Sequence, residues 1–500
     1  MKKKCIALVC AAALALSLTA CGTVGQTGAA DTDTNTNAVQ AVGAEVSLEG
    51  ATTLTFTGSG VAASDGDYTG YAIDGTALAI DGAGTYILTG TCGNGSVTVK
   101  KGTTGVTLVL NGLDLTSTDT APITCNKSTE VTIYAAPGSV NVLTDSAENN
   151  DESYPDNENA ENAVIKCKDG SRVTLCGTGS LTVNANGKNG IKSGASTAEE
   201  GEASLTIREL ALTIDAPVND AVNAEQLLTI ESGTLTISAG GDALHCDLAL
   251  NIGADGTAGP TITMTDCCEG IEGATLNIYS GDIAINATDD CLNAANSDLS
   301  GYDFSINISG GTITAYTSGG DGFDSNGDLN ISGGTVAVWS ASSADNQPLD
   351  ADGAIRITGG TVLAAGGSSG MGMSLTAEQP CVVFSFSGSG GFGGNSGGSA
   401  LTKGSAFTIG SGSTAVYSGE VLCNAGFVFF SSSALTADSS YDLAAGGSTL
   451  AAAAQTGSVQ TGMGGMGSMG GQPGQMPGGS FDPGSAPTPP SGDFRPGNRQ

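Results

Sequence analysis

The hydrophobic and polar positions of this chain alternate with a period of two, in short runs that glycine-rich and acidic turns separate. Leu276-Asn277-Ile278 is typical, because two apolar residues flank one polar residue as in a half-buried strand. Thr, Ile and Val dominate the runs, and these residues suit pleated surfaces. Pairs such as Gly310-Gly311 mark turns. The pattern predicts short β-strands and, in the mature chain, no amphipathic helix.

The runs recur in a degenerate repeat of about 22 to 30 residues, each copy marked by one anchoring isoleucine. The anchors are Ile207, Ile230, Ile252, Ile278, Ile308, Ile331 and Ile357. One copy holds two or three strands, which predicts one coil of a parallel β-helix whose coils stack at roughly 4.8 Å. A single coil cannot bury its inward side, so the stack itself forms the core. The variable spacing and the lack of a hexapeptide period favour the right-handed form; a propeller or a sandwich stays open as the alternative.

The chain divides into five predicted parts. These are a lipoprotein signal peptide (1–20), a polar tether (21–44), an all-β right-handed parallel β-helix or solenoid (45–378), a C-terminal β cap (379–450) and a disordered Gly/Met/Pro-rich tail (451–500). A cap is expected because an open terminal coil exposes an unpaired edge.

The N-terminus has the pattern of an export signal. Three lysines precede the apolar stretch Ile6–Leu18, and Leu18-Thr19-Ala20-Cys21 resembles a bacterial lipobox. The motif predicts cleavage before Cys21, lipid on its thiol, and a protein anchored on the extracellular face of the bacterial cell membrane. An ordinary secretory signal is the alternative.

The net charge limits the kinds of molecule that the chain can bind, and the cysteine content bears on whether it forms disulfides. The formal net charge of −34 argues against nucleic acid and anionic surfaces. It favours cations, neutral partners, or an anionic polymer held through bound cations. Ten cysteines remain after Cys5, Cys10 and Cys21 are set aside, and both disulfides and buried thiols fit that even number.

Each repeat also carries an acidic turn around an apolar residue, as in Asp290-Cys291-Leu292-Asn293. The apolar residue points inward, so the flanking residues form an outward ladder of carboxylates. Neighbouring charges about 5 Å apart repel by roughly 3 kcal/mol at an effective dielectric near 20, and Ca²⁺ with its preference for oxygen ligands would relieve this. The candidate ligands are Asp220, Asp242, Glu269, Glu272, Asp289, Asp290, Asp321, Asp324, Asp350 and Asp352. Asp and Gly filling tight turns for backbone reasons is the alternative.

Two further ladders are candidates for carbohydrate binding. Asn251, Asn277, Asn307 and Asn330 each precede an anchoring isoleucine, and we expect them to stack outward in register. Tyr316 and Trp339 both lie eight residues after their anchors, which predicts an outward aromatic pair on adjacent coils. Rings offer apolar faces to sugars and amides bind hydroxyls, so Tyr316, Trp339, Asn307 and Asn330 are the predicted sugar contacts. Cross-strand packing of the aromatics is the alternative, and the lone His245 is predicted to be a turn residue.

At this point the chain resembles a known family, bacterial surface carbohydrate-binding proteins with a right-handed parallel β-helix similar in fold to pectate lyases. The resemblance covers about residues 45–447. It rests on Asn189-Gly190-Ile191, the repeated acidic turns, Pro348–Gly353, Ile357–Gly366, Ser369-Gly370-Met371 and the strand near Phe429. It implies calcium binding and attachment to plant cell-wall polysaccharides such as cellulose and polygalacturonate, without a need for catalysis.

Three functions follow from this reading. The first is a monomeric, lipid-anchored, calcium-dependent and non-catalytic carbohydrate-binding protein. The second is a calcium-dependent pectate-type lyase, which needs a base to remove the α-proton of a uronate. Its candidate bases are Lys188, Lys192, Arg208 and Arg356. The third is a structural surface adhesin.

Overall fold

The computed structural model describes residues 46–64, 69–341, 346–366, 373–386 and 401–461. Every regular element in these ranges is a β-strand, which confirms the all-β class. The described residues contain no helix with the length and hydrophobicity for a membrane crossing. The predicted signal peptide, Cys21 and the tether lie outside the described residues, as do the predicted tail from residue 462 onward and residues 388–398.

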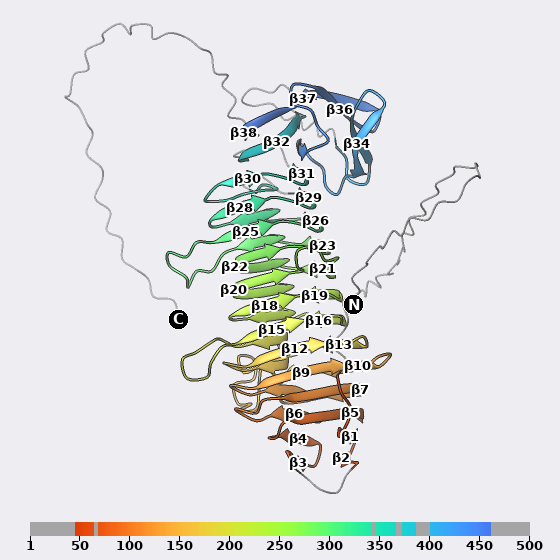
Figure 1. The fold of residues 1–500 in the computed structure, drawn as a ribbon, viewed down its shortest axis with the longest axis vertical. Coiled ribbons are helices and arrows are strands. Elements are labelled where there is room, and N and C mark those ends of the chain that lie inside the picture. The colour runs from red at the N-terminus through yellow and green to blue at the C-terminus, as the bar shows by residue number, and fades with distance from the viewer. Residues whose placement is uncertain (1–45, 65–68, 342–345, 367–372, 387–400, 462–500) are drawn as a thin grey trace, which may run out of the picture. The chain divides into compact units, whose positions relative to one another are not determined.

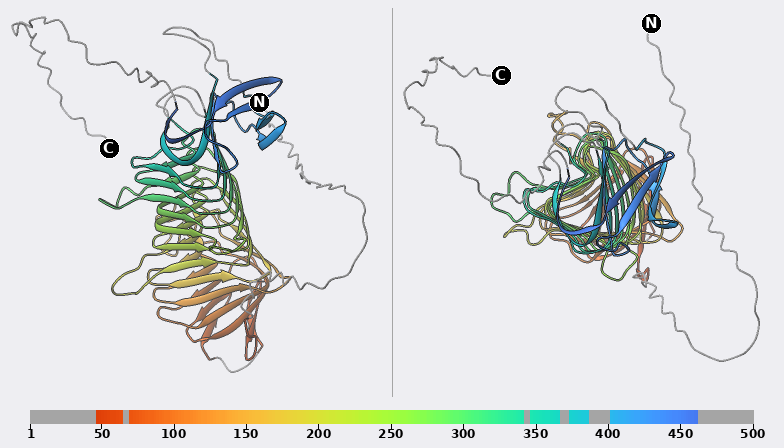
Figure 2. Two further views of the ribbon diagram at one scale, coloured as in Figure 1. Left: turned by 45° about the horizontal axis from the view of Figure 1, so that its top comes forward. Right: turned by 90° about the horizontal axis from the view of Figure 1, so that it is seen from above.

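The strands stack coil upon coil (Figure 1). Each repeat contributes three strands, and each of these pairs in parallel with the corresponding strand of the repeats before and after it. We call the three resulting stacks columns 1, 2 and 3, in the order in which each coil passes through them. The view along the stack shows the coils superposed on one another (Figure 2).

Column 1 consists of β4 (Ala77–Ile80), β6 (Ser96–Val99), β8 (Ile123–Cys125), β11 (Ala163–Cys167), β14 (Asn189–Ser193), β17 (Val222–Ala224), the first parts of β20 (Leu244–Ile252) and β22 (Ile271–Ile278), β24 (Leu292–Ala294) and β27 (Phe323–Ser325). Column 2 consists of the first parts of β5 (Gly84–Cys92) and β7 (Val106–Thr116), then β9 (Glu130–Ala135), β12 (Arg172–Cys176), β15 (Ser204–Ile207), β18 (Leu227–Ile230), the second parts of β20 and β22, β25 (Ser305–Ile308), β28 (Asp328–Ile331), β30 (Ile355–Ile357) and the start of β32 (Ser374–Ser385).

Column 3 continues from the second parts of β5 and β7 through β10 (Val140–Thr144), β13 (Ser180–Asn184), β16 (Ala211–Ala216), β19 (Thr234–Ala239), β21 (Thr261–Cys267), β23 (Asp282–Ala287), β26 (Thr312–Thr317), β29 (Thr335–Ser340) and β31 (Thr361–Gly366). Antiparallel hairpins start the stack. They are formed by β1 (Thr52–Thr57) with β2 (Gly60–Ala63), and by β3 (Tyr71–Asp74) with β4.

The predicted anchors hold the core. Successive anchoring isoleucines are register partners in column 2, from Ile207 opposite Ile230 to Ile331 opposite Ile357, and all seven are buried. The apolar residue of each acidic turn is equally buried, as with Ile271 in column 1. Each coil thus buries aliphatic side chains against the next coil, at about 25 cal/mol per Å² of apolar surface removed from water.

Glycine pairs shape the turn between columns 2 and 3. Gly334, the second glycine of its pair, has a φ of 81°, which side-chain-bearing residues rarely adopt. A Cβ on the first, Gly333, would collide with the carbonyl oxygen of Ser309 in the neighbouring coil. The repeated Gly-Gly therefore lets adjacent coils approach closely.

The C-terminal part closes the other end of the stack with antiparallel strands (Figure 1). β35 (Phe427–Ser432) pairs with both β31 and β32. The strands β33 (Ala406–Ser411), β34 (Thr414–Glu420), β36 (Ser440–Ala445) and β37 (Ser448–Ala453) form a separate antiparallel sheet. The expected boundary after residue 378 falls inside β32, where its register shifts between Ala377 and Cys381.

The prediction of disorder from residue 451 is wrong for the first eleven residues. β37 extends to Ala453, and β38 (Gln455–Gln460) pairs antiparallel with β32. Small and polar residues dominate this segment, so its composition does not indicate a strand. Ala454 and Val459 are nevertheless buried.

All ten described cysteines carry free thiols, and nine of them are buried. Cys125 and Cys167 are direct register partners inside column 1. The sequence allowed either disulfides or buried thiols, and the structure shows buried thiols at the described cysteines.

Candidate functional site

The outward positions of column 1 form a single polar ladder. Register pairs connect Lys166, Lys192, Asn223, His245, Glu272, Asn293 and Asp324 in that order, one residue per coil. We call this series the column-1 ladder. Its first members are basic and its last members are acidic, so charge changes sign along one face of the stack.

The acidic turn residues lie beside this ladder, and several of their carboxylates accept hydrogen bonds from the next coil. Asp220 Oδ1 accepts a hydrogen bond from the backbone N–H of Asp242 at 3.0 Å, and Asp242 Oδ1 accepts one from Glu269 N–H at 3.3 Å. Asp290 Oδ1 likewise accepts one from Asp321 N–H at 2.6 Å. One oxygen of these carboxylates therefore ties successive coils together, as the turn-filling interpretation expects. The remaining oxygens are left for other partners.

Three carboxylates converge at the acidic end, which we call the upper cluster. Ligand oxygens of Asp321, Asp324 and Asp350 all lie within 4.8 Å of one another. Burial raises the pKa of Asp321 to about 7, opposed by a backbone hydrogen bond from Gln347 and reinforced by Asp350 and Asp324. Burial followed by Asp350 and Asp352 raises the pKa of Asp324. Burial and the like charges of neighbouring carboxylates both favour the protonated forms of these groups.

The surroundings of the upper cluster add further acidic and acceptor groups. Burial raises the pKa of Asp290 to about 7, and Asp321, Asp324 and Asp289 contribute to the rise. Gln347, which is 8% exposed, has a buried Oε1 without a hydrogen-bond donor among the described residues. An amide oxygen of this kind is a hard ligand like the carboxylates around it.

A second group, which we call the middle cluster, contains Asp242, Glu269 and Glu272, whose ligand oxygens also lie within 4.8 Å of one another. Burial raises the pKa of Glu269 to about 8, with the charges of Glu272 and Asp242 adding to it. Glu269 Oε2 and Asn293 Oδ1 are buried without a donor among the described residues. Both predicted clusters therefore combine carboxylates with unused acceptor atoms.

The prediction that His245 is a simple turn residue is wrong. It lies on β20 in the column-1 ladder, with Nδ1 at 2.6 Å from Glu272 Oε2 and 3.2 Å from Asp242 Oδ2, and Nε2 at 2.9 Å from Asp247 Oδ1. Burial lowers its pKa, but the hydrogen bonds to Asp242, Asp247 and Glu272 outweigh this and raise it to about 12. A protonated His245 thus supplies the middle cluster with a built-in cation, whereas none of the described residues forms an ion pair with the three carboxylates of the upper cluster.

Both carboxylate oxygens of the candidate ligand Asp220 accept hydrogen bonds within the protein. Its Oδ2 accepts a hydrogen bond from Asn223 Nδ2 at 2.7 Å, and its Oδ1 is bonded to the next coil. Asp289 and Asp352 are exposed at the edges of the upper cluster. Ligand atoms of Asp220, Asp242 and His245 also lie within 4.8 Å of one another, so Asp220 adjoins the middle cluster. The predicted ligands therefore form the two clusters, with Asp220 beside the middle one and the other carboxylates at their edges.

The asparagine ladder follows its predicted register. Asn277 donates to Asn251 Oδ1 at 2.9 Å, Asn307 to Asn277 Oδ1 at 3.1 Å, and Asn330 to Asn307 Oδ1 at 3.0 Å. These amides lie half-buried on column 2. Their mutual hydrogen bonds contribute to coil stacking whether or not a sugar contacts them.

Replacing Asn307 with alanine is expected to lower the free energy of unfolding by roughly 1–2 kcal/mol, because it removes hydrogen bonds to Asn277, Asn330 and Ser305. Asn251→Ala is the matched control, since that side chain lies at the start of the ladder, accepts one hydrogen bond from Asn277 and should cost less. Denaturant titration of both variants measures the difference. Equal losses would contradict a cooperative ladder.

The predicted solvent-facing aromatic pair is half wrong. Tyr316 and Trp339 are register partners and point away from the stack interior, as alternation predicts. Trp339 is nevertheless only 2% exposed, because the cap covers it, and its ring meets Phe407 edge-on at 5.8 Å. Tyr316 is half-buried, with Lys403 Nζ 4.8 Å from its ring centre. Alternation gave the direction of the rings but carried no information on the sheet that covers one of them.

The four predicted lyase bases all have acidic partners. Lys188 pairs with Glu152 at 2.6 Å, Lys192 with Glu225 at 3.6 Å, Arg208 with Glu231 at 4.0 Å and Arg356 with Asp328 at 2.6 Å. Sequence reasoning did not select Lys166, which occupies the ladder position next to Lys192. Its signal in the sequence is the outward position of Lys166 between the buried Ile165 and Cys167.

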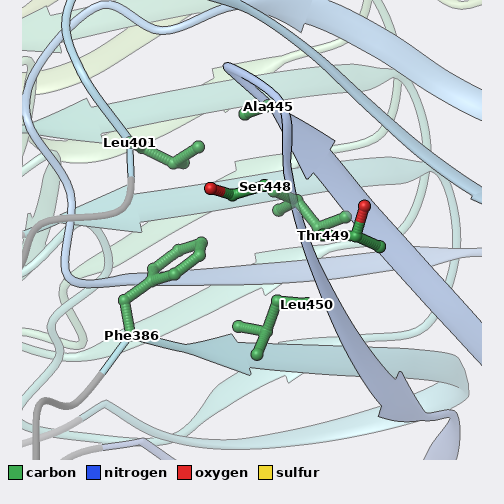
Figure 3. Close-up of a pocket in the computed structure, with 7 residues that line it drawn as sticks. Phe386, Leu401, Ala445, Ser448, Thr449 and Leu450 are labelled. Atoms are coloured by element: carbon green, nitrogen blue, oxygen red, sulfur yellow. The ribbon is translucent and has the colours of Figure 1, made fainter.

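One small cavity, of about 150 Å³, lies within the cap and is apolar (Figure 3). Phe386, Leu401, Leu443 and Leu450 line it with small neighbours, and no charged side chain takes part. It contains neither the carboxylates nor the amides of the column faces, so it forms no part of the candidate site.

The chain is similar to known proteins and matches one family model. A protein of Acetivibrio thermocellus described as a carbohydrate-binding domain-containing protein is 40% identical over 109 residues, which are 22% of this chain and 37% of that relative. The chain thus spans little more than a third of the relative's length. A solved structure, described as the polysaccharide lyase-like protein from C. thermocellum in a gadolinium derivative, is 24% identical with a TM-score of 0.32, and the match covers 62% of this chain and 93% of that one. The family model for carbohydrate-binding domain-containing proteins matches residues 74–372, more than half of the chain, and the protein therefore belongs to that family.

Proposed function

We propose that this protein is a lipid-anchored, calcium-dependent and non-catalytic binding protein for extracellular polysaccharide, built on a right-handed parallel β-helix. One observation carries the proposal: the outward face of a chain in a carbohydrate-binding family gathers carboxylates beside buried oxygen acceptors that have no donor among the described residues. Variable insertions at one turn of a three-strand coil favour the right-handed form, and the lipobox at Cys21 supports the anchor and the extracellular position.

The upper cluster fits a calcium ion best. Ca²⁺ takes six to eight oxygen ligands, and Asp321, Asp324 and Asp350 offer carboxylates that can bind it together with backbone or amide oxygens. The middle cluster has the same ligand chemistry but shares Asp242 and Glu272 with the His245 imidazolium. A bound calcium ion would supply open coordination positions for sugar hydroxyls or carboxylates.

The residues themselves provide the rest of a binding surface. The asparagine ladder of column 2 lies on the same coils as both clusters and offers amide groups at regular spacing, roughly 4.8 Å per coil. Regular spacing suits a polymer of repeated units better than a single small molecule. Non-catalytic binding is favoured over elimination because each base predicted for a lyase is held in an ion pair.

A pull-down with insoluble and acidic glycans tests the proposal. The chain from Gly22 onward is expected to be retained in calcium and released by chelator, while absorbance at 235 nm stays flat. Cellulose and polygalacturonate are the first probes, and a glycan-free matrix is the control. Retention that ignores the chelator would contradict calcium dependence, and rising absorbance would show a lyase instead.

The anchor has its own test. Expression of the full chain and of Cys21→Ser in a bacterium with the lipoprotein pathway should give membrane-associated and released protein, respectively. Equal release of both would leave an ordinary secretory signal as the correct interpretation.

A further inference from the structure

One pair of buried cysteines lies in register inside the stack. Cys125, at the end of β8, and Cys167, at the end of β11, are register partners on adjacent coils of column 1. A hydrogen bond with the Cys167 thiol, followed by burial, raises the pKa of Cys125. Among the described strands, no other register pair joins two cysteines. Coil stacking therefore brings these two thiols into contact.

The separation of the two residues is compatible with a disulfide bond. Neighbouring strands of a sheet lie roughly 4.8 Å apart, and the Cα atoms of disulfide-bonded cysteines lie about 4.4 to 6.8 Å apart. Cys125 and Cys167 both point into the core from the same position of their strands. Bond formation therefore needs rotation about the side-chain torsions and little movement of the backbone.

The chain between these cysteines forms the longest coil of column 1. From Ile123 to its register partner Ile165 the coil takes 42 residues, whereas the other coils of this column take 19 to 31. The extra residues belong to the 145–162 segment between β10 and β11. A covalent link stabilises a fold mainly by restricting the unfolded chain, and its effect grows with the length of the closed loop. A bond between Cys125 and Cys167 would therefore close the coil whose closure costs the most conformational entropy.

We propose that Cys125 and Cys167 form a disulfide bond when the chain folds in an oxidising environment, and that the structure shows the reduced form of this pair. The thiolate of one cysteine attacks a disulfide-type oxidant and releases half of it as a thiol. The other cysteine then displaces the second half. The S–S bond thus forms while the oxidant is reduced to two thiols. The proposed function enters only through the extracellular position, where such oxidants persist.

Burial determines when the bond can form. Both cysteines are 0% exposed, so an oxidant cannot reach either sulfur atom in the folded protein. The raised pKa of Cys125 also disfavours the thiolate, which is the reactive form. Oxidation therefore precedes the closure of this coil, and the finished bond is shielded from reductants in the same way. A chain that folds without an oxidant keeps two thiols.

Refolding of the full chain tests the pairing without any substitution. Denatured and reduced protein is refolded with oxidised and reduced glutathione, its remaining thiols are alkylated, and the peptides are mapped by mass spectrometry without reduction. A linked pair of peptides that contains Cys125 and Cys167 and has lost two hydrogens is expected in most molecules.

Cys246 is the matched control for this mapping. It occupies the same inward position of column 1, but its register partners are Ala224 and Gly273. It should be alkylated in most molecules. Equal alkylation of Cys125, Cys167 and Cys246 overturns the proposal, and so does linkage of Cys125 mainly to any cysteine other than Cys167.

Thermal unfolding tests the effect on the long coil. Protein refolded with the oxidant is expected to melt at least 3 °C above protein refolded with a reductant. In Cys167→Ala the two preparations should melt at the same temperature, because the cross-link cannot form. Equal melting temperatures of the two wild-type preparations overturn the stabilising role of the bond.

Protein recovered from the surface of an exporting bacterium, with its thiols blocked at lysis, separates this proposal from the proposed function. Linked Cys125 and Cys167 support oxidation after export. Free thiols at both positions overturn it, even where calcium-dependent retention on glycans succeeds. A linked pair in protein that no glycan retains leaves the disulfide standing and contradicts the proposed binding function.

Discussion

Replacing Asp324 and Asp350 together with asparagine is expected to lower the affinity for Ca²⁺ by about a hundredfold, or about 2.7 kcal/mol. Calcium affinity depends on the number of charged ligands, and this double variant removes two of the three carboxylates of the upper cluster while keeping their size. The same change should raise the melting temperature without metal, because it removes repulsion among buried carboxylates. Calorimetric titration and thermal unfolding, with and without calcium, measure both effects.

A cation site predicts that the double variant binds Ca²⁺ more weakly but melts at a higher temperature without metal. A purely structural cluster does not predict this combination. Asp282→Asn is the matched control, since this aspartate is exposed at the start of β23 in column 3. It should change neither quantity. A double variant that is less stable in chelator and binds calcium normally would show that Asp324 and Asp350 serve the fold alone.

Much of the fold was predictable because it depends on local alternation. The anchoring isoleucines repeat at spacings that the chain itself displays, and they pair with one another in the structure. The asparagines before them inherit the same register. In a solenoid, each coil contacts mainly its neighbours, so the sequence period translates directly into contacts.

The errors arose where distant segments meet. Trp339 points outward from its coil as expected, but the cap strand β33 brings Phe407 against it from a segment about 70 residues later. β38 was missed because its pairing with β32 decides its conformation, whereas its small and polar residues suggest a loop. Neither contact leaves a periodic signal in the local sequence.

The sequence predicted that the acidic side chains form a ladder on one face. It did not predict which of them gather into clusters. The acidic turns placed Asp321 and Asp324 on the correct face, but which oxygens are used by backbone N–H groups depends on exact coil stacking. His245 and Cys167 acquire their meaning from register partners on other coils. Single residues without a motif of their own become functional candidates only once the coils are aligned.

Metal-free protein is expected to lose stability as pH rises from about 4.5 to 8. Folding raises the pKa of Glu269 to about 8, and those of Asp290 and Asp321 to about 7, above their ordinary values of 4.5 and 3.8. In that interval the folded protein binds more protons than the unfolded chain, so the free energy of unfolding falls with increasing pH. Each fully linked proton changes it by about 1.4 kcal/mol per pH unit. His245 adds to this fall above pH 6.5, because folding raises its pKa from 6.5 to about 12 and the folded protein keeps a proton that the unfolded chain loses.

Calcium should weaken this trend, because it replaces the protons on the same carboxylates. Its affinity is expected to rise from pH 5 to about pH 8 and then level off, with proton release on binding at pH 6. Thermal unfolding at half-unit pH steps should show a decrease of roughly 5 °C or more in chelator, and a much smaller one in calcium. Glu269→Gln removes the group with the highest of these pKa values, so it should flatten the metal-free curve near pH 8. A metal-free melting temperature that rises across the interval would mean that these carboxylates are ionised and compensated by the protein alone, and the argument for a cation at this face would fail with it.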